Sequence, residues 1–521
     1  MRYRIILAAA LAACAQPGRG PTAPAAPPCA CPAPANAPPS TAPPLTAPPP
    51  AGQLTAKQAL RDLRILERAV TDLHPGLYRY LTPAAWAAEL AWARGQVAAG
   101  VDRGQMYRIV SHIGAAIRCG HTWTNPLNQR ADVRDEVLGA ADKLPVEVRL
   151  IEDRLLVTGS ATAAVVAGTE LAAVDGVPPA AMVAELLPYL RADGSNDGKR
   201  RAQLDHGEDG GALDLLWPLL HPPVDGHYRL SVVDATGRRD VVVPATTAAA
   251  RTAAIAAAGG APSPPADWTF TIDGDTAVLT LPTFAFWNSD FDWRGFLAQT
   301  FATLAARRVP YLVIDQRRNE GGDGAIVDAL VGYLIDRPLT TPPVQAEVAF
   351  ERAPYDLARF LDTWDWSFFD RTGHVTRGAG RNLVDTAASS PGDTITPAPD
   401  RYAGRTFVLI GPDNSSAGFV LAARLKQAGA ATLVGRTTGG NRRGINGGQL
   451  TWVTLPESGV ALDIPLIAWM PRTAAPDAGI EPDLAVPASF DDAAAGRDLD
   501  LAAARAAIAG LRRAGASARA P

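Results

Sequence analysis

The stretch Arg405-Thr-Phe-Val-Leu-Ile-Gly-Pro-Asp-Asn-Ser-Ser-Ala-Gly-Phe-Val-Leu-Ala-Ala-Arg-Leu-Lys-Gln427 decides the fold prediction. Residues 406–410 are an apolar, β-branched run of strand length, the next four residues form turns readily, and residues 417–427 have a helical pattern. Ser415 and Ser416 therefore lie where a buried strand turns into a helix. The unpaired N–H groups and the positive dipole end of this helix would face an oxyanion formed there. For an isolated motif of this kind, the alternative is a serine that only caps the helix.

The surrounding sequence repeats this alternation of strand and helix. We expect strands at 276–282, 310–315 and 431–435, and helices at 291–306 and 326–335. Strands that alternate with helices predict a largely parallel sheet covered on both faces. Sites in such sheets form at the carboxyl ends of strands, where Asp315 to Gly324 and Gly411 to Ser416 both fall.

The first half of the chain has other patterns. Residues 54–101 and 106–117 show helical spacing, with a break at His74-Pro75-Gly76. Residues 145–178 change to short strands, and a helix near 180–190 and a strand pair near 228–243 complete a small α/β module. Its segment 168–178 resembles part of a PDZ domain. An Ala-rich linker that ends in prolines follows.

These patterns predict a multidomain α/β protein. Its parts are an N-terminal helical region, a small PDZ-like α/β module and a C-terminal βα domain, expected to be catalytic, that resembles the ClpP/crotonase-like type. The expected divisions are a signal peptide (1–13), a Pro/Ala-rich tether (14–52), a helical domain (53–130), the PDZ-like module (131–245), a linker (246–265), the catalytic domain (266–490) and a C-terminal helix and tail (491–521).

The first residues predict export. A basic start, a short apolar core and small residues are typical of a signal peptide, and Leu11-Ala-Ala-Cys14 resembles a bacterial lipobox. The resemblance implies lipidation of Cys14, and the alternative is an ordinary signal peptide. We expect a bacterial lipoprotein facing the periplasm or cell surface, which contacts the membrane only through this anchor.

Composition and motif searches exclude several function classes. A net charge of −4 does not favour a nucleic-acid partner. The seven histidines are scattered and no His-Glu-x-x-His pattern occurs, so no metal is expected. The glycine-rich segment 315–324 lacks the lysine of a nucleotide-binding loop, and we expect no cofactor.

Several motifs together carry a family resemblance. Cys-Gly-His121-Thr, Ile-Asp315-x-Arg-x-Asn-x-Gly-Gly322, Asn-Ser-Ser416-Ala, Val434-Gly-Arg-Thr-Thr-Gly-Gly-Asn and Gly479-Ile-Glu-Pro-Asp occur in that order. This set resembles the serine peptidase family of the C-terminal processing (tail-specific) proteases and the tricorn core protease. Processing proteases have a lysine about 25 positions after the serine, where this chain has Asn441. The resemblance is therefore to the tricorn-like, histidine-dependent branch.

The resemblance implies the roles of individual residues. Ser416 would be the nucleophile, with Ser415 as its rival, and His121 the general base and then acid. The N–H groups of Gly321 and Ala417 would stabilise the oxyanion. An acid would orient the imidazole: Asp477 is nearest to the family's position, which is Pro476 here, and Glu481 is the alternative. Thr122 is a candidate for an additional hydroxyl.

The predicted function is an exported serine endopeptidase that hydrolyses polypeptides through an acyl-enzyme. Two alternatives remain: a catalytically silent protein of the same fold that binds ligands in the cleft, and an envelope scaffold that recruits partners through the PDZ-like module. The sequence does not predict the oligomeric state.

Overall fold

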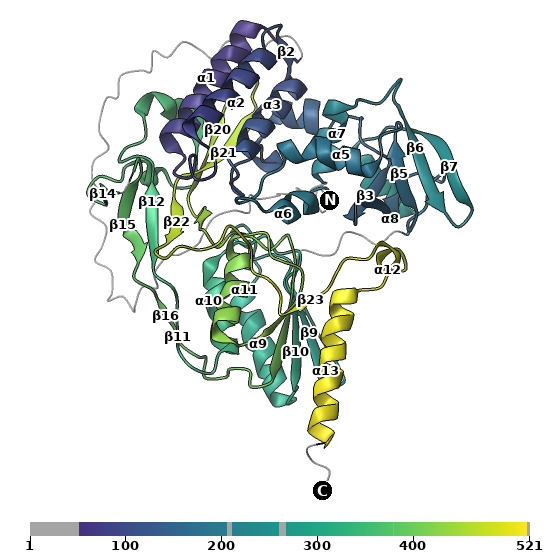
Figure 1. The fold of residues 1–521 in the computed structure, drawn as a ribbon, viewed down its shortest axis with the longest axis vertical. Coiled ribbons are helices and arrows are strands. Elements are labelled where there is room, and N and C mark those ends of the chain that lie inside the picture. The colour runs from purple at the N-terminus through teal and green to yellow at the C-terminus, as the bar shows by residue number, and fades with distance from the viewer. Residues whose placement is uncertain (1–51, 206–210, 260–266, 379, 518–521) are drawn as a thin grey trace.

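The structure, a computed structural model, describes residues 52–205, 211–259, 267–378 and 380–517 (Figure 1). The predicted signal peptide, Cys14 and nearly all of the tether lie outside these residues. Within the described ranges, no helix is both long and apolar enough to cross a membrane. The protein is a multidomain α/β protein, as the sequence predicts.

A six-stranded sheet forms the centre of the C-terminal domain. Its strand order is β23-β18-β17-β10-β9-β8. Every neighbouring pair is parallel except β8 and β9, which form an antiparallel hairpin at one edge. The strands are β8 (Thr269–Asp273), β9 (Thr276–Thr280), β10 (Tyr311–Asp315), β17 (Arg405–Ile410), β18 (Thr432–Gly435) and β23 (Leu484–Ala485). The largely parallel sheet predicted from the apolar runs is confirmed.

Helices cover both faces of this sheet. One face packs against α9 (Trp293–Ala306), α10 (Gly324–Leu334) and α11 (Ser416–Ala428) in one apolar core. The other face packs against the C-terminal helix α13 (Leu499–Ser517), where Ala504 and Ile508 meet alternate residues of the same strands. Because strand side chains point alternately to the two faces, one apolar run supplies both cores.

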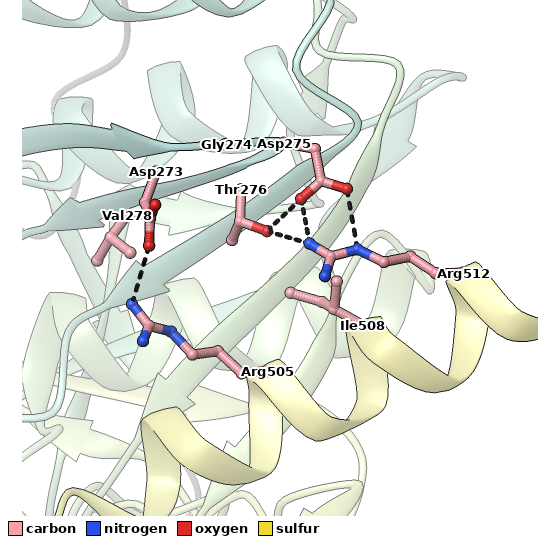
Figure 2. A pocket seen from close by; sticks show the side chains of 8 residues that line it. All are labelled: Asp273, Gly274, Asp275, Thr276, Val278, Arg505, Ile508 and Arg512. Atoms are coloured by element: carbon pink, nitrogen blue, oxygen red, sulfur yellow. Dashed lines mark hydrogen bonds and ion pairs between the residues drawn. The ribbon is translucent and has the colours of Figure 1, made fainter.

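A small groove lies between α13 and the β8–β9 hairpin (Figure 2). Ion pairs cross it from Arg512 to Asp275 and from Arg505 to Asp273. It opens at the amino end of β9, whereas Ser416 follows the carboxyl end of β17. The two strands run in the same direction, so this groove is remote from the candidate site.

The N-terminal region is helical, as predicted. Its helices are α1 (Ala56–Leu73), α2 (Pro83–Gln96) and α3 (Arg103–Ala116). Thr55 and Asp102 each begin a helix with a capping box, in which side chain and backbone satisfy each other's hydrogen bonds. The chain leaves α1 at His74, where the sequence predicts the break.

The small module contains a five-stranded antiparallel sheet in the order β3-β4-β5-β6-β7. The strands are β3 (Val146–Ile151), β4 (Arg154–Ser160), β5 (Glu170–Val174), β6 (His227–Asp234) and β7 (Gly237–Pro244). Between β5 and β6 the chain forms α5 (Pro179–Leu186), α6 (Asp197–Ala202) and α7 (Ala212–Leu220).

The first half of the expected linker at 246–265 contains a helix. Residues Ala248–Ala257 form helix α8, which Thr247 caps. Arg251 on α8 is buried and makes two hydrogen bonds with the buried carboxylate of Asp214, at 2.7 and 2.6 Å. Alanine is the best helix former, and the ion pair attaches this Ala-rich helix to the small module.

Two further sheets were not predicted. One has the order β14-β15-β12-β22-β19 and the other β13-β20-β21. Their strands are β12 (Val344–Val348), β13 (Leu361–Asp362), β14 (Val375–Arg377), β15 (Leu383–Ser390), β19 (Ile445–Asn446), β20 (Leu450–Thr454), β21 (Ala461–Pro465) and β22 (Ala468–Pro471). Their apolar side chains join those of α1, α3 and the small module in one core. Much of the segment between β12 and β22 therefore packs with the N-terminal half, although it lies within the catalytic domain predicted from sequence.

Short elements complete the described chain. They are β1 (Gln53–Leu54), β2 (Val101–Asp102), β11 (Leu339–Thr340), β16 (Thr394–Ile395), α4 (Ala131–Val133), α12 (Phe490–Ala494), the 3-10 helices Pro126–Asn128, Leu187–Tyr189, Tyr355–Phe360 and Trp366–Phe369, and the π-helix Arg134–Leu138.

Candidate active site

Ser416 is the first residue of α11, directly after the loop that follows β17. Its φ is +47°, a left-handed conformation that costs an L-residue energy and is often found at functional sites. Ser415 occupies the N-cap position, but its side chain makes no capping hydrogen bond; its hydroxyl donates instead to the carbonyl of Glu320 at 3.1 Å. The two serines are thus in different environments, and neither acts as an ordinary helix cap.

The glycine loop after β10 lies directly against Ser416. A methyl group on Gly321, whose φ is +118°, would lie 2.8 Å from both Ser416 Cβ and the Ala417 nitrogen. Only glycine allows so close an approach. Asn319 fixes this loop, since its amide donates to Leu281 O at 2.9 Å and its oxygen accepts from Gly321 N–H at 2.8 Å.

The bond from Gly321 to Asn319 corrects one expectation. The N–H of Gly321 is already used, so it does not point at a free oxyanion site in this structure. The N–H groups of Gly322 and Ala417, by contrast, make no hydrogen bond with any described residue.

The direction of the Gly322 N–H follows from strand order. Phe284 follows β9, Gly322 follows β10, and the two form a parallel bridge. Phe284 donates to Gly321 O and accepts from Asp323 N–H, both at 2.9 Å, so the peptide groups of Gly322 face the opposite side. That side holds the Ser416 loop, because β10 lies between β9 and β17.

Asn414 holds the serine loop in place. Its side-chain amide donates to the carbonyls of Gln316 and Asn319, and its side-chain oxygen accepts from Gly411 N–H at 2.9 Å. Its own carbonyl accepts from Gly439 and Gly440 N–H at 2.8 and 2.9 Å. One buried asparagine therefore joins the loops that follow β10, β17 and β18.

His121 lies in a turn after α3 and is buried. A methyl group on Gly447 would approach Nε2 and Cε1 of the ring to 3.0 Å, so the imidazole packs against that glycine. Burial, with help from the nearby charge of Arg191, lowers the pKa of His121 to about 3, although Glu320 opposes the shift. The ring is therefore neutral near pH 7, and its Nδ1 is buried without a hydrogen-bond partner in the described chain.

Neither of the two acids that the sequence suggested has a described contact with His121. Asp477 accepts hydrogen bonds from Asn441 Nδ2 at 2.6 Å and Ser195 N–H at 3.2 Å, and none of the described contacts joins it to His121. Glu481 is exposed, and its carbonyl accepts from Lys426 in the last turn of α11. That turn is ~15 Å along the helix from Ser416, so Glu481 is not placed to orient His121.

Asp193 is an acid near His121 that the sequence did not reveal. Its Oδ1 accepts from the N–H of Gly120 at 2.9 Å, and its Oδ2 is buried with no partner among the described residues. Burial raises the pKa of Asp193. The residue belongs to the segment between α5 and α6, and no motif marks it.

The neighbour of His121, Thr122, is held by a second histidine. His74 Nε2 lies 2.9 Å from the hydroxyl of Thr122, and His74 Nδ1 accepts from Gly76 N–H at 2.9 Å. Because Nδ1 accepts, Nε2 carries the proton and donates to Thr122. His74, at the break after α1, thus supports the turn that carries the candidate base His121.

The sequence also missed a lysine beside the serine loop. Lys199 is far from Ser416 in sequence, but its buried ammonium contacts Glu320 Oε1 at 2.7 Å and Asp413 O at 3.3 Å. Such an ammonium is a hydrogen-bond donor held by acidic groups and offers no lone pair to a hydroxyl. No group of three or more potential metal ligands occurs among the described residues.

Residues 275–486 match the model of peptidase family S41. No curated protein matches the chain. Among solved structures, mature CPAF complexed with lactacystin has 18% identity and a TM-score of 0.56, over 84% of this chain and 95% of that chain. A CPAF mutant has 18% identity and a TM-score of 0.58, over 84% and 94%.

The sheet, with its glycine loop and strand-end serine, defines a protein of the α/β serine peptidase class. Residues 275–486 form a domain of peptidase family S41, a family of serine-type peptidases. The likeness to CPAF extends over most of the chain and supports the same fold. His121 lies outside the matched residues, so the family match does not extend to its role.

Proposed function

We propose that this S41 peptidase is an endopeptidase that cleaves polypeptides through an acyl-enzyme on Ser416, with His121 as general base. The observation that carries the proposal is the position of Ser416. It begins α11 with a φ of +47° and lies against the glycine loop, between two N–H groups that bond to no described residue.

In the proposed reaction, His121 accepts the hydroxyl proton as Ser416 Oγ attacks the peptide carbonyl. The protonated imidazole then gives the proton to the leaving amine, and water hydrolyses the ester by the same path. Because burial lowers the pKa of His121, the imidazole is neutral and able to accept a proton over the physiological range, although the same shift makes it a weaker base.

The oxyanion would be bound by the N–H groups of Ala417 and Gly322. Ala417 N–H belongs to the first turn of α11, where the helix dipole adds a partial positive charge. Gly322 N–H approaches from the neighbouring loop, while Gly321 allows the two loops to meet closely. One such donor is typically worth a factor of about 10²–10³ in turnover.

Two carboxylates remain candidates for orienting His121. Asp477 lies nearest to the position that the resemblance implies, but here it holds Asn441; Asp193 binds the turn before His121 and keeps one buried oxygen free. Kinetics of Asp477→Asn and Asp193→Asn separate them. Loss of the orienting acid should lower kcat by up to about 10⁴-fold with little change in KM.

The direct test of the proposal is peptide hydrolysis by Ser416→Ala and His121→Ala, with circular dichroism to confirm folding. Both variants should lose activity. Full activity in His121→Ala would exclude the proposed base.

A second candidate function is a catalytically silent protein that binds peptides in the same cleft. The observation in its favour is His121 Nδ1, which has no described partner where a peptidase of this type needs an acid. A wild-type protein that binds peptides but neither hydrolyses them nor reacts with a fluorophosphonate at Ser416 would select this function.

We also propose that the enzyme is exported and anchored by lipid on Cys14. The support is the N-terminal sequence alone, with its basic start, apolar core and lipobox-like Leu11-Ala-Ala-Cys14. Cys14→Ser should move the protein from the membrane fraction to the soluble fraction of the cell envelope. Unchanged membrane association would contradict lipid anchoring.

A further inference from the structure

Arg191 connects the turn that carries His121 to the glycine loop. One guanidinium nitrogen donates to the carbonyl of Gly120 at 2.5 Å, and another donates to Glu320 Oε2 at 3.0 Å. The guanidinium also stacks on the ring of Trp123, 3.8 Å from its centroid. The side chain is only 8% exposed, so its position is fixed by these contacts.

Lys199 connects the glycine loop to the serine loop. Its ammonium contacts Glu320 Oε1 at 2.7 Å and Asp413 through the carbonyl and, at 3.9 Å, the carboxylate. Ser415 adds a second link by donating to the carbonyl of Glu320 at 3.1 Å. The two side-chain oxygens of Glu320 are therefore held by different cations, Oε1 by Lys199 and Oε2 by Arg191.

Glu320 is therefore the residue at which three loops meet. Gly120 precedes His121, Ser415 precedes Ser416, and Glu320 itself precedes Gly321. The two cations come from the small module, since Arg191 follows α5 and Lys199 lies on α6. Although burial opposes ionisation, Lys199 and Arg191 lower the pKa of Glu320 to about 2, so its carboxylate stays ionised at neutral pH.

We propose that Glu320, with Arg191 and Lys199, is a positioning residue that holds His121 and Ser416 in the relative position needed for proton transfer. The inference rests on the function proposed above. Glu320 is not the acid that orients His121 here, because no described hydrogen bond joins the two and His121 Nδ1 has no described partner. A misplacement of about 1 Å at a reacting centre can cost about 100-fold in rate, so loss of this anchor acts on turnover.

The test uses the full chain and peptide hydrolysis, with the active fraction titrated by a fluorophosphonate. Glu320→Gln should lower kcat per titrated site about 10- to 100-fold, with KM changed less than about threefold. Glu320→Asp, which keeps the charge, should recover part of the loss. Lys199→Met should lower kcat per titrated site less in the Glu320→Gln background than in the wild type, because the contact between the two residues is already lost.

Asp214→Asn is the matched control. It breaks the buried ion pair with Arg251, which lies within the small module. We expect it to lower the melting temperature but leave kcat per titrated site unchanged, which separates general stability from positioning.

Equal kcat per titrated site in wild type and Glu320→Gln, within about twofold, would overturn the inference, since positioning effects are much larger. A variant whose only change is a smaller fraction of titratable protein would also overturn the inference, because such a change reports a folding defect and not a positioning effect. Failure of the proposed function would look different: the wild type itself would neither hydrolyse peptide nor react at Ser416.

Discussion

The hydroxyl of Ser415 donates a hydrogen bond of 3.1 Å to the carbonyl of Glu320. The two serines therefore have different structural roles. Ser415 links the serine loop to the glycine loop, whereas Ser416 has the strained backbone at the start of α11. The sequence alone had left the two serines as rivals. Their different contacts lead to different expected effects on activity.

Ser415→Ala should keep most activity, with a loss of no more than about tenfold. The variant removes one hydrogen bond between loops, worth about 1 kcal/mol, and leaves the proposed nucleophile intact. Ser416→Ala should reduce turnover to background. Peptide hydrolysis by the two purified variants decides between them, and the reverse pattern would make Ser415 the nucleophile.

Ser416→Gly should be more stable than Ser416→Ala by ~1 kcal/mol. Both variants lack the hydroxyl, but only glycine adopts a φ of +47° without a steric cost. Urea unfolding of the two variants measures the difference. Equal stabilities would mean that the turn relaxes and that the backbone at Ser416 is not strained.

The activity of the free enzyme should persist below the ordinary titration range of histidine. Burial and the charge of Arg191 lower the pKa of His121 from 6.5 to about 3, so the base stays neutral until the pH falls well below 6.5. The acid limb of kcat/KM, which reports the free enzyme, should lie below pH 5 at constant ionic strength. An acid limb at about 6.5 would contradict a buried His121.

The contribution of His74 to protein stability should fall as the pH is lowered from 6.5. Burial, with nearby arginines, lowers the pKa of His74 to about 3. Below pH 6.5 the unfolded chain binds a proton that folded His74 does not, which costs about 2 kcal/mol at pH 5. Relative to the wild type, His74→Gln should therefore gain unfolding free energy as the pH is lowered from 6.5 to 5. An unchanged slope would mean that His74 is accessible to protons in the folded state.

The parallel sheet was predictable because β9, β10, β17 and β18 are buried on both faces and read as continuous apolar runs. The sheets formed by β12, β15, β20 and β22 were not predicted. Their half-buried strands lie between long loops and pair with segments far away in sequence, such as Glu347 with Ala468. The sequence of helix α8 does not distinguish it from a linker, because its many alanines resemble the Pro/Ala-rich tether.

The site could be predicted only where a motif marks it. The loops around Ser416 and Gly321 follow apolar strands and contain turn residues and glycines, so their positions at the sheet edge could be inferred. The ion-paired residues Arg191, Lys199 and Glu320 carry no such signal. Lys199 and Glu320 are separated by 121 positions, and a lysine on a polar helix is indistinguishable from a solvent-exposed one. Asp193 likewise could not be predicted, because no sequence motif marks it.

The central claim is that His121 activates Ser416. Its most direct test is the rate at which a fluorophosphonate labels the protein, with the modified residue located by mass spectrometry. The account predicts labelling of Ser416 in the wild type and a loss of rate of about 10³-fold or more in His121→Ala, as for removal of a catalytic base. Labelling of Ser416 at the same rate in both proteins, or labelling of another serine in the wild type, would contradict it.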